Sequence, residues 1–163
     1  MRPTLNNIFM QTAELFAQRS TCIRVQVGSI LVRDNKIIAT GYNGSTKNHQ
    51  HCYDYFKDSK LDIHSQEFID KHFKFSEEHE LHAEQNVLLF CAKEGISTKD
   101  TTLYITLSPC LSCAKVIYVS GITKVIYKKE YDRDLRGIEF LKENNIIIEK
   151  YSEQLFYKLN KDI

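Results

Sequence analysis

The sequence lacks an excess of charge of either sign, since 22 Lys and Arg face 21 Asp and Glu among its 163 residues. A chain so close to neutral offers no global electrostatic attraction for nucleic acid or for an acidic membrane. No apolar run approaches the length of about 20 residues that spans a bilayer. The opening residues MRPTLNNIFM lack the basic-then-apolar layout of a secretion signal. We therefore expect a cytoplasmic protein without a nucleic-acid or membrane partner.

Internal repeats and low-complexity segments are also absent. The composition, 42% hydrophobic and 26% charged, is ordinary for a globular protein, and the length suits one domain with a real core. We expect residues 1–163 to form a single domain. Five cysteines are an odd number, and in a reducing compartment cysteines serve more often as metal ligands or core residues than as disulfides.

Hydrophobic periodicity predicts an alternation of helices and strands. The predicted helices cover residues 4–19, 82–94, 113–121 and 134–145, and the predicted strands cover 25–32, 36–43, 101–107, 124–128 and 146–151. Thr4 is the expected N-cap of the first helix, and Gly95 should end the second. The expected inner face of the second helix consists of Val87, Leu88, Cys91 and Ala92. This order predicts an α/β fold, a mixed sheet with helices on its faces.

Residues 44–80 interrupt the alternation, because they are polar, rich in His and Lys, and show no clear period. A structureless loop of that length is uncommon in a compact domain. We expect either disorder or an outside constraint, such as a metal that orders the segment without a core.

Near the C-terminus, the aromatic residues Tyr151, Phe156 and Tyr157 are expected to pack on the sheet or on a partner subunit.

The stretch SPCLSC places Cys110 and Cys113 in a C-x-x-C pair, which can hold zinc, act as a redox pair or be structural. His82 and Glu84 begin the preceding predicted helix. Both sets lie where a strand or loop enters a helix, so both can point to one end of the sheet. Three ligands, His82, Cys110 and Cys113, leave the fourth tetrahedral position open, which is the catalytic arrangement of zinc. Glu84 remains free for proton transfer.

The pattern H-x-E…P-C-x-x-C is the known signature of zinc nucleobase deaminases. The chain resembles the deoxycytidylate (dCMP) deaminase family over RSTCIRVQVGSILV, GYNG, LHAEQN and LYITLSPCLSCAKVI. The resemblance implies a three-layer α-β-α sandwich with a five-stranded mixed sheet, as in cytidine deaminases. It also implies zinc-dependent hydrolysis of dCMP to dUMP and ammonia, the step that supplies the dTMP precursor.

The resemblance assigns roles to individual residues. Glu84 would move protons, and the backbone N–H of Ala83 and the carbonyl of Ser108 would hold the edges of the base. Asn43 of GYNG matches a position that contacts the nucleotide, although a turn Asn is the alternative. Two further positions stay open from the residues alone: Arg24 is either a phosphate contact or a surface residue, and Tyr131 either closes over the base or lies in a loop.

Phage-type members of the family carry a second, structural zinc on two Cys, a His and a Glu. The matching residues here are Cys22, Cys52, His72 and Glu80, and such a metal would order an insertion at about 44–80. Taken singly, Cys22 could be a core residue, His72 a solvated one and Glu80 a helix-start acid. Four rival histidines lie in or beside the same segment: His49, His51, His64 and His79.

The resemblance further implies a homo-oligomer, often a hexamer, with dCTP as activator, dTTP as inhibitor and Mg²⁺ accompanying a nucleotide effector.

Other activities compete with dCMP deamination as interpretations of the sequence. One is a deaminase of another small substrate, such as dCTP, cytidine, cytosine or guanine. The near-zero net charge disfavours a polynucleotide deaminase. The intact Glu84 disfavours a non-catalytic zinc module, and the His partner of the C-x-x-C pair disfavours a disulfide redox protein.

Overall fold

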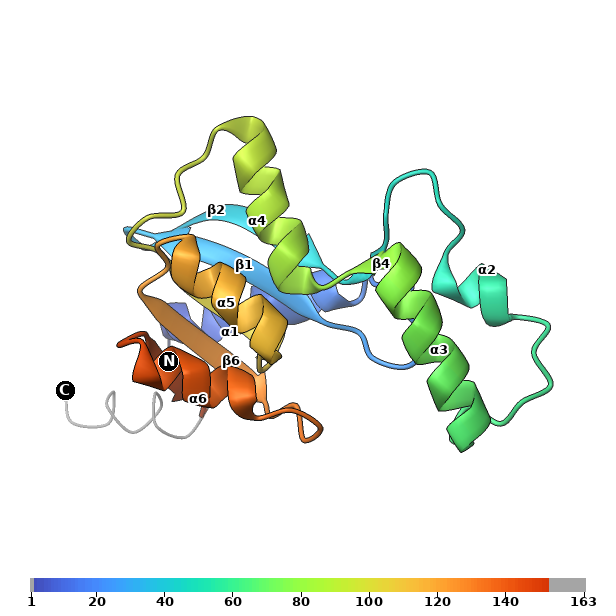
Figure 1. Cartoon of the computed structure of the whole chain (residues 1–163). Coiled ribbons are helices and arrows are strands. Elements are labelled where there is room, and N and C mark those ends of the chain that lie inside the picture. Colours follow the sequence, from blue (N-terminus) through green and yellow to red (C-terminus); the bar gives the residue numbers. More distant parts are fainter. Residues whose placement is uncertain (1, 153–163) are drawn as a thin grey trace.

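A five-stranded mixed sheet runs through the molecule. The structure is a computed structural model that describes residues 2–152 (Figure 1). The strand order is β2-β1-β5-β6-β7, with β1 antiparallel to both β2 and β5 and with β5, β6 and β7 parallel. The strands are β1 (Gly28–Arg33), β2 (Lys36–Tyr42), β5 (Thr102–Leu107), β6 (Lys124–Lys129) and β7 (Ile147–Lys150). The helices that cover the sheet are α1 (Leu5–Ala17), α4 (Ala83–Glu94), α5 (Leu111–Val119) and α6 (Arg136–Glu143).

Helices cover both faces of the sheet and make three layers. On one face α1 packs Phe9, Met10 and Ala13 against strand residues that include Ile30 and Tyr104. On the other face α4, α5 and α6 bury one continuous apolar cluster against the strands, to which they contribute Val87, Leu88, Cys91, Ala114, Ile117, Ile138 and Leu141. Burial of apolar side chains on both faces is the main stabilising contribution of such a sandwich. The predicted α/β sandwich with a five-stranded mixed sheet is confirmed.

Local signals in the sequence are also confirmed at the element ends. The Thr4 hydroxyl accepts the N–H of Asn7 at 3.2 Å, as an N-cap should, and Gly95 ends α4 in the left-handed region at φ 67°. The hairpin between β1 and β2 turns through Asp34 and Asn35, both at positive φ. Two left-handed residues match the twist that tight hairpins require. The expected inner face of α4 is wrong at one position, because Ala92 is exposed.

The first strand begins three residues later than predicted, at Gly28 rather than at residue 25. The backbone of Val27 pairs with Asn43 instead: its N–H donates to the Asn43 side-chain oxygen at 2.8 Å, and its carbonyl accepts the Asn43 N–H at 3.0 Å. At Gly28 itself, a Cβ would lie 2.0 Å from the Ala13 carbonyl oxygen. The sheet therefore starts where a residue without a side chain allows α1 to approach.

Residues 44–81 form a separate group of elements beside the sheet (Figure 1). They are β3 (Gly44–Ser45), α2 (Cys52–Phe56), α3 (Gln66–His79) and β4 (Glu80–Leu81), and β3 pairs with β4. The expectation of a segment without a core is wrong, because Phe56, Phe68 and Phe75 are buried together here. The spacing of Phe68, His72 and Phe75 on α3 is helical, a signal hidden by the surrounding charges.

The chain ends on the α1 face of the sheet as far as it is described. Tyr151 is buried there and its hydroxyl donates to the Asn7 side-chain oxygen at 2.9 Å, which confirms packing on the sheet. Phe156 and Tyr157 lie outside the described residues. Within residues 2–152, none of the helices combines the length and the apolar character that crossing a membrane requires.

Candidate metal and active site

His82, Cys110 and Cys113 meet at the end of the sheet where α4 and α5 begin. His82 is the N-cap of α4, Cys110 is the N-cap of α5, and Cys113 lies in the first turn of α5. The Nδ1 atom of His82 lies 3.3 Å from the Cys113 sulfur and 3.7 Å from the Cys110 sulfur. Tetrahedral zinc with ordinary bond lengths separates a nitrogen and a sulfur ligand by roughly 3.6 Å. The donor set and its spacing therefore fit zinc with three protein ligands.

The charges in this cluster also suit a metal. Hydrogen bonding from Cys113, helped by His82, lowers the pKa of the Cys110 thiol to about 4 against the opposing effect of burial. Contact with Cys110 raises the pKa of His82 to about 9. Without a metal, the cluster already favours a thiolate balanced by a nearby cation. Thiolate is the form in which cysteine ligates zinc.

Glu84 points away from solvent rather than lying as an exposed acid at the start of a helix. It is 5% exposed in the first turn of α4. Burial raises the pKa of this carboxyl to about 7, with the nearby His82 opposing the shift. Glu84 is not one of the three clustered donors. A carboxyl that takes up and releases a proton near neutral pH is suited to general acid–base work.

The start of α4 is fixed against the sheet by several contacts. Ser29 on β1 donates to the Ala83 carbonyl at 2.9 Å, and the Asn86 side chain donates to the Tyr42 carbonyl on β2 at 2.8 Å. Within the helix start, the backbone N–H of His82 donates to the Gln85 side-chain oxygen at 2.9 Å. At Gly41 on β2, a Cβ would lie 2.7 Å from the Ala83 carbonyl oxygen. His82 and Glu84 therefore sit on a helix end that cannot shift without disturbing β1 and β2.

A second set of contacts holds the loop that carries Cys110, and the sequence reasoning missed most of it. The N–H of Leu111 donates to the Asp134 carboxylate at 3.4 Å. Arg136 in turn donates two side-chain hydrogen bonds to Asp134, at 2.8 and 3.2 Å. The Arg136 guanidinium holds the pKa of Asp134 down at about 2. The carboxylate therefore stays charged and available to the start of α5.

Gly137 supports the same loop from α6. A Cβ at this position would lie 2.0 Å from the Pro109 carbonyl oxygen and 2.9 Å from the Cys110 carbonyl carbon. The glycine inside the predicted helix at 134–145 was the available signal, since an isolated helical Gly often marks close packing.

The proposed substrate contacts fall into two groups. Ser108 and Tyr131 lie together, because the N–H of Tyr131 donates to the Ser108 hydroxyl at 2.8 Å, next to the loop of Cys110. Asn43 uses its side-chain amide on the backbone, accepting from Val27 and donating to Val25 at 2.8 Å each. Arg24 is half-buried and lines an open cleft of about 620 Å³ with Ser20, Thr21, Cys22, Ile23, Gln26 and Tyr53.

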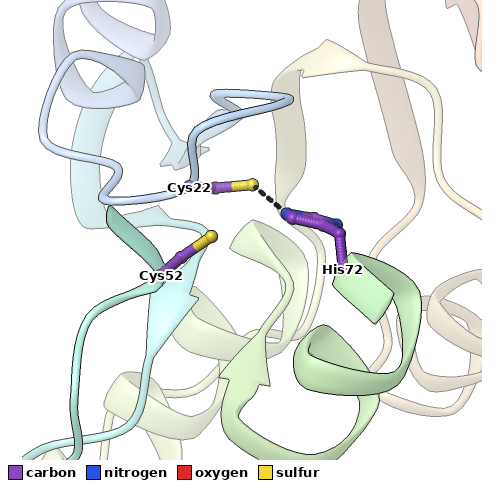
Figure 2. A group of neighbouring side chains, drawn as sticks. All are labelled: Cys22, Cys52 and His72. Carbon is purple, nitrogen blue, oxygen red and sulfur yellow. Dashed lines mark hydrogen bonds between the residues drawn. The ribbon is translucent and has the colours of Figure 1, made fainter. Parts of the chain in front are cut away.

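A second group of metal-type donors lies where the insertion meets the loop after α1. Figure 2 shows Cys22, Cys52 and His72 pointing toward one another from the loop after α1, the start of α2 and the middle of α3. The Cys22 sulfur lies 3.3 Å from His72 Nε2, and all three donor atoms lie within 4.8 Å of one another. All three residues are buried. Hydrogen bonding from Cys52 lowers the pKa of Cys22 to about 4, so this group also favours a thiolate.

Glu80 lies beside this group without belonging to the three clustered donors. Burial, followed by the nearby Cys22 charge, raises the pKa of its carboxyl. Its Oε1 atom is buried and has no hydrogen-bond partner. An unpaired buried carboxylate oxygen next to two cysteines and a histidine fits a fourth ligand. The rival histidines at positions 49, 51, 64 and 79 stand outside both clusters found among residues 2–152.

The chain shows clear similarity to known proteins. Residues 3–129 match the family model described as the cytidine and deoxycytidylate deaminase zinc-binding region. The chain is 33% identical over 160 residues to the deoxycytidylate deaminase of Enterobacteria phage T4, covering 83% of each protein. It is 36% identical over 149 residues to ComE operon protein 2 of Bacillus subtilis (strain 168), covering 91% of this chain and 72% of that protein.

Solved structures agree with these similarities. The crystal structure of dCMP deaminase from the cyanophage S-TIM5 in complex with dCMP and dUMP has a TM-score of 0.74 to this chain at 36% identity. The superposition covers 93% of this chain and 99% of that chain. The residues matched by the family model include every member of both His/Cys clusters.

Because Gly137 closely approaches the Cys110 loop, we expect that replacing this glycine by alanine destabilises the fold, the opposite of the usual effect in a helix. In a helix interior, Ala is ordinarily more stable than Gly by about 1 kcal/mol. Here the added Cβ must displace Pro109 and Cys110, so Gly137→Ala should destabilise the fold by about 1–3 kcal/mol. Thermal unfolding should show a melting temperature lower by roughly 2–10 °C. Glu139→Ala, at an exposed position on the same helix, is the control. An unchanged melting temperature for Gly137→Ala would refute the close packing of Gly137 against the loop of Cys110.

Proposed function

This chain belongs to the cytidine and deoxycytidylate deaminase family, and we propose that it catalyses the zinc-dependent hydrolytic deamination of dCMP to dUMP and ammonia. One observation carries the proposal. His82, Cys110 and Cys113 form a group of three zinc-type donors, and beside it lies the buried Glu84, whose carboxyl has its pKa raised to about 7. The similarity to a structure that contains dCMP and dUMP supports the choice of substrate.

The chemistry replaces the C4 amine of cytosine by an oxygen from water. Zinc held by His82, Cys110 and Cys113 would act as a Lewis acid and lower the pKa of water to roughly 7. Glu84 would accept a proton from the attacking water and deliver it to ring N3. It would then help to protonate the leaving amine, which departs as ammonia. One carboxyl can serve both transfers because they occur in sequence.

Recognition of the base would fall to backbone groups beside the metal. The N–H of Ala83 and the carbonyl of Ser108 would hold the edges of cytosine, and Tyr131 would close over the ring. The hydrogen bond between Ser108 and Tyr131 supports this grouping, since it ties the two contacts together.

Recognition of the phosphate would fall to Arg24. Asn43 would serve the same nucleotide site through the segment it holds, Val25 to Val27, which directly follows Arg24. The half-buried position of Arg24 supports this role, because a partly exposed guanidinium remains accessible to an anion.

A second zinc, held by Cys22, Cys52, His72 and Glu80, would be structural. Closed four-ligand sites are typical of structural zinc, whereas three ligands leave room for chemistry. The burial of the two cysteines and the histidine, and the unpaired oxygen of Glu80, support this assignment. Such a metal would join the loop after α1 to α2 and α3, three segments that share only a small aromatic core.

Assembly and regulation follow from the same resemblance. We propose a homo-oligomer, with a hexamer as the expected size, regulated by dCTP and dTTP with Mg²⁺ accompanying the nucleotide effector. Exposed apolar side chains on α4 and α5 support a subunit interface: Leu89, Phe90, Val116 and Val119. We also propose a cytoplasmic location, which agrees with five cysteines that are all free thiols.

The proton-transfer role of Glu84 can be separated from metal binding. Glu84→Gln keeps the shape of the side chain but cannot move a proton, so kcat should fall by about 10²–10⁴-fold. Zinc content should stay at the wild-type value, whereas Cys110→Ala should lose the catalytic zinc as well as activity. Assays of dUMP formation and elemental analysis measure both quantities. Glu94→Gln, at the exposed end of the same helix, is the control; a fully active Glu84→Gln enzyme would rule out the role.

The structural zinc should matter for stability before it matters for chemistry. Cys52→Ala should remove one zinc per chain and lower the melting temperature by about 10 °C or more, since loss of a bound metal is among the largest single-site effects. Hydrogen exchange should quicken in residues 44–81. Cys91→Ala is the control: it truncates a buried cysteine that lies outside both clusters, and this variant should keep the wild-type zinc content. Unchanged zinc content in Cys52→Ala would contradict the second site.

The phosphate should account for much of the substrate binding. A hydrogen bond to a charged group contributes about 1.5–3 kcal/mol, so one or two such bonds give dCMP an advantage over deoxycytidine of roughly one to four powers of ten in kcat/KM. Arg24→Gln should remove most of that advantage while leaving the kcat/KM for deoxycytidine unaffected. Arg19→Gln, at an exposed position in the turn after α1, is the control. Equal kcat/KM values for the two substrates in the wild type would indicate a nucleoside deaminase instead.

A further inference from the structure

Helix α5 begins at the proposed catalytic zinc without a side-chain cap of its own. The first turn of a helix leaves backbone N–H groups unpaired, and the side chains that usually satisfy such groups stand at the N-cap and three residues later. In α5 these two positions are Cys110 and Cys113, and both side chains are proposed zinc ligands. The Cys110 side chain makes no capping hydrogen bond. The start of α5 therefore depends on a partner from elsewhere in the chain.

The segment Tyr131–Asp134 contacts the zinc-ligand loop on both of its sides. On one side the N–H of Tyr131 donates to the Ser108 hydroxyl at 2.8 Å, and on the other the N–H of Leu111 donates to the Asp134 carboxylate at 3.4 Å. The N–H of Asp134 donates to the Tyr131 carbonyl at 3.0 Å, so the two contacts belong to one turn. Ser108 and Leu111 directly precede and follow the Pro-Cys dipeptide of the loop.

Asp134 is held in the orientation that its contact with Leu111 needs. The Asp134 side chain is only 14% exposed, and the Arg136 guanidinium donates to both of its carboxylate oxygens, at 2.8 Å and 3.2 Å. The backbone N–H of Arg136 donates to the same carboxylate at 3.1 Å. A carboxylate suits the start of a helix, where the helix dipole is positive. The guanidinium neutralises the carboxylate, which limits its repulsion of the nearby cysteine thiolates.

We propose that Asp134 is a positioning residue of the catalytic zinc site, whose carboxylate caps α5 from outside the helix and so fixes the backbone that carries Cys110 and Cys113. The inference rests on the proposed catalytic zinc. Leu111, whose N–H the carboxylate accepts, is the first residue of α5 and lies between the two cysteines. Without this cap the first turn of α5 frays more readily, and a frayed turn changes the distance between the two sulfur ligands.

The experiment follows zinc release from the intact holoenzyme to a coloured chelator, and the phase that disappears in Cys110→Ala is the catalytic one. Asp134→Ala should speed this phase by about 2–30-fold, the factor that corresponds to loss of a helix N-cap. Release from the proposed structural site should stay unchanged. Asp132→Ala removes an exposed carboxylate from the same segment, so it is the matched control and should release zinc at the wild-type rate.

Leu111→Pro separates capping from general support by the Asp134 side chain. Proline has no N–H, suits the first position of a helix, and is compatible with the extended conformation of Cys110 before it (φ −69°, ψ 168°). In a Leu111→Pro background the carboxylate has no N–H to accept, so Asp134→Ala should cause no further acceleration.

Two results would overturn the inference: equal acceleration by Asp134→Ala in both backgrounds, or a wild-type release rate in Asp134→Ala itself. A Cys110→Ala protein that keeps the wild-type zinc content would instead overturn the proposed catalytic zinc, and the inference with it. Zinc content therefore distinguishes a failure of the proposed function from a failure of the inference alone.

Discussion

The span Glu80 to His82 is the constraint on which both proposed metal sites depend. Only Leu81 separates the carboxylate that adjoins the Cys22 group from the imidazole of the Cys110 and Cys113 group. Consecutive Cα atoms are about 3.8 Å apart, so neither side chain can move far without moving the other. Pairing of β3 with β4 fixes the first half of the span, and the hydrogen bond from His82 to Gln85 fixes the second. The charges of Glu80 and His82 also influence each other's pKa.

The sheet explains why the reactive groups converge at all. Parallel strands β5 and β6 require a crossover, and α5 provides it with its N-terminus at the edge where α4 also begins. The N-caps of the two helices are His82 and Cys110, so two of the proposed zinc ligands stand at fixed helix ends. Ala83, Gly41 and Gly137 then bring backbone close to backbone around them. Rigid elements of this kind hold a metal geometry more tightly than free loops do.

Much of this arrangement could be predicted because its signals are local. Hydrophobic alternation gave the strands, helical spacing gave four of the helices, and the spacing of His82, Cys110 and Cys113 identified the first cluster. What escaped prediction depends on contacts between distant residues. Helix α3 hides its buried stripe of Phe68, His72 and Phe75 among charged neighbours. Asp134 acts on the loop of Cys110 only because tertiary packing brings α6 there, which no local pattern encodes.

The central claim is that two zinc ions flank the span from Glu80 to His82. Anomalous X-ray scattering at the zinc absorption edge, collected on crystals of the protein as purified, tests it directly. Two peaks per chain are predicted, one bounded by His82, Cys110 and Cys113 and the other by Cys22, Cys52, His72 and a carboxylate oxygen of Glu80. A single peak, or a second peak without Glu80 in its coordination, would contradict the account.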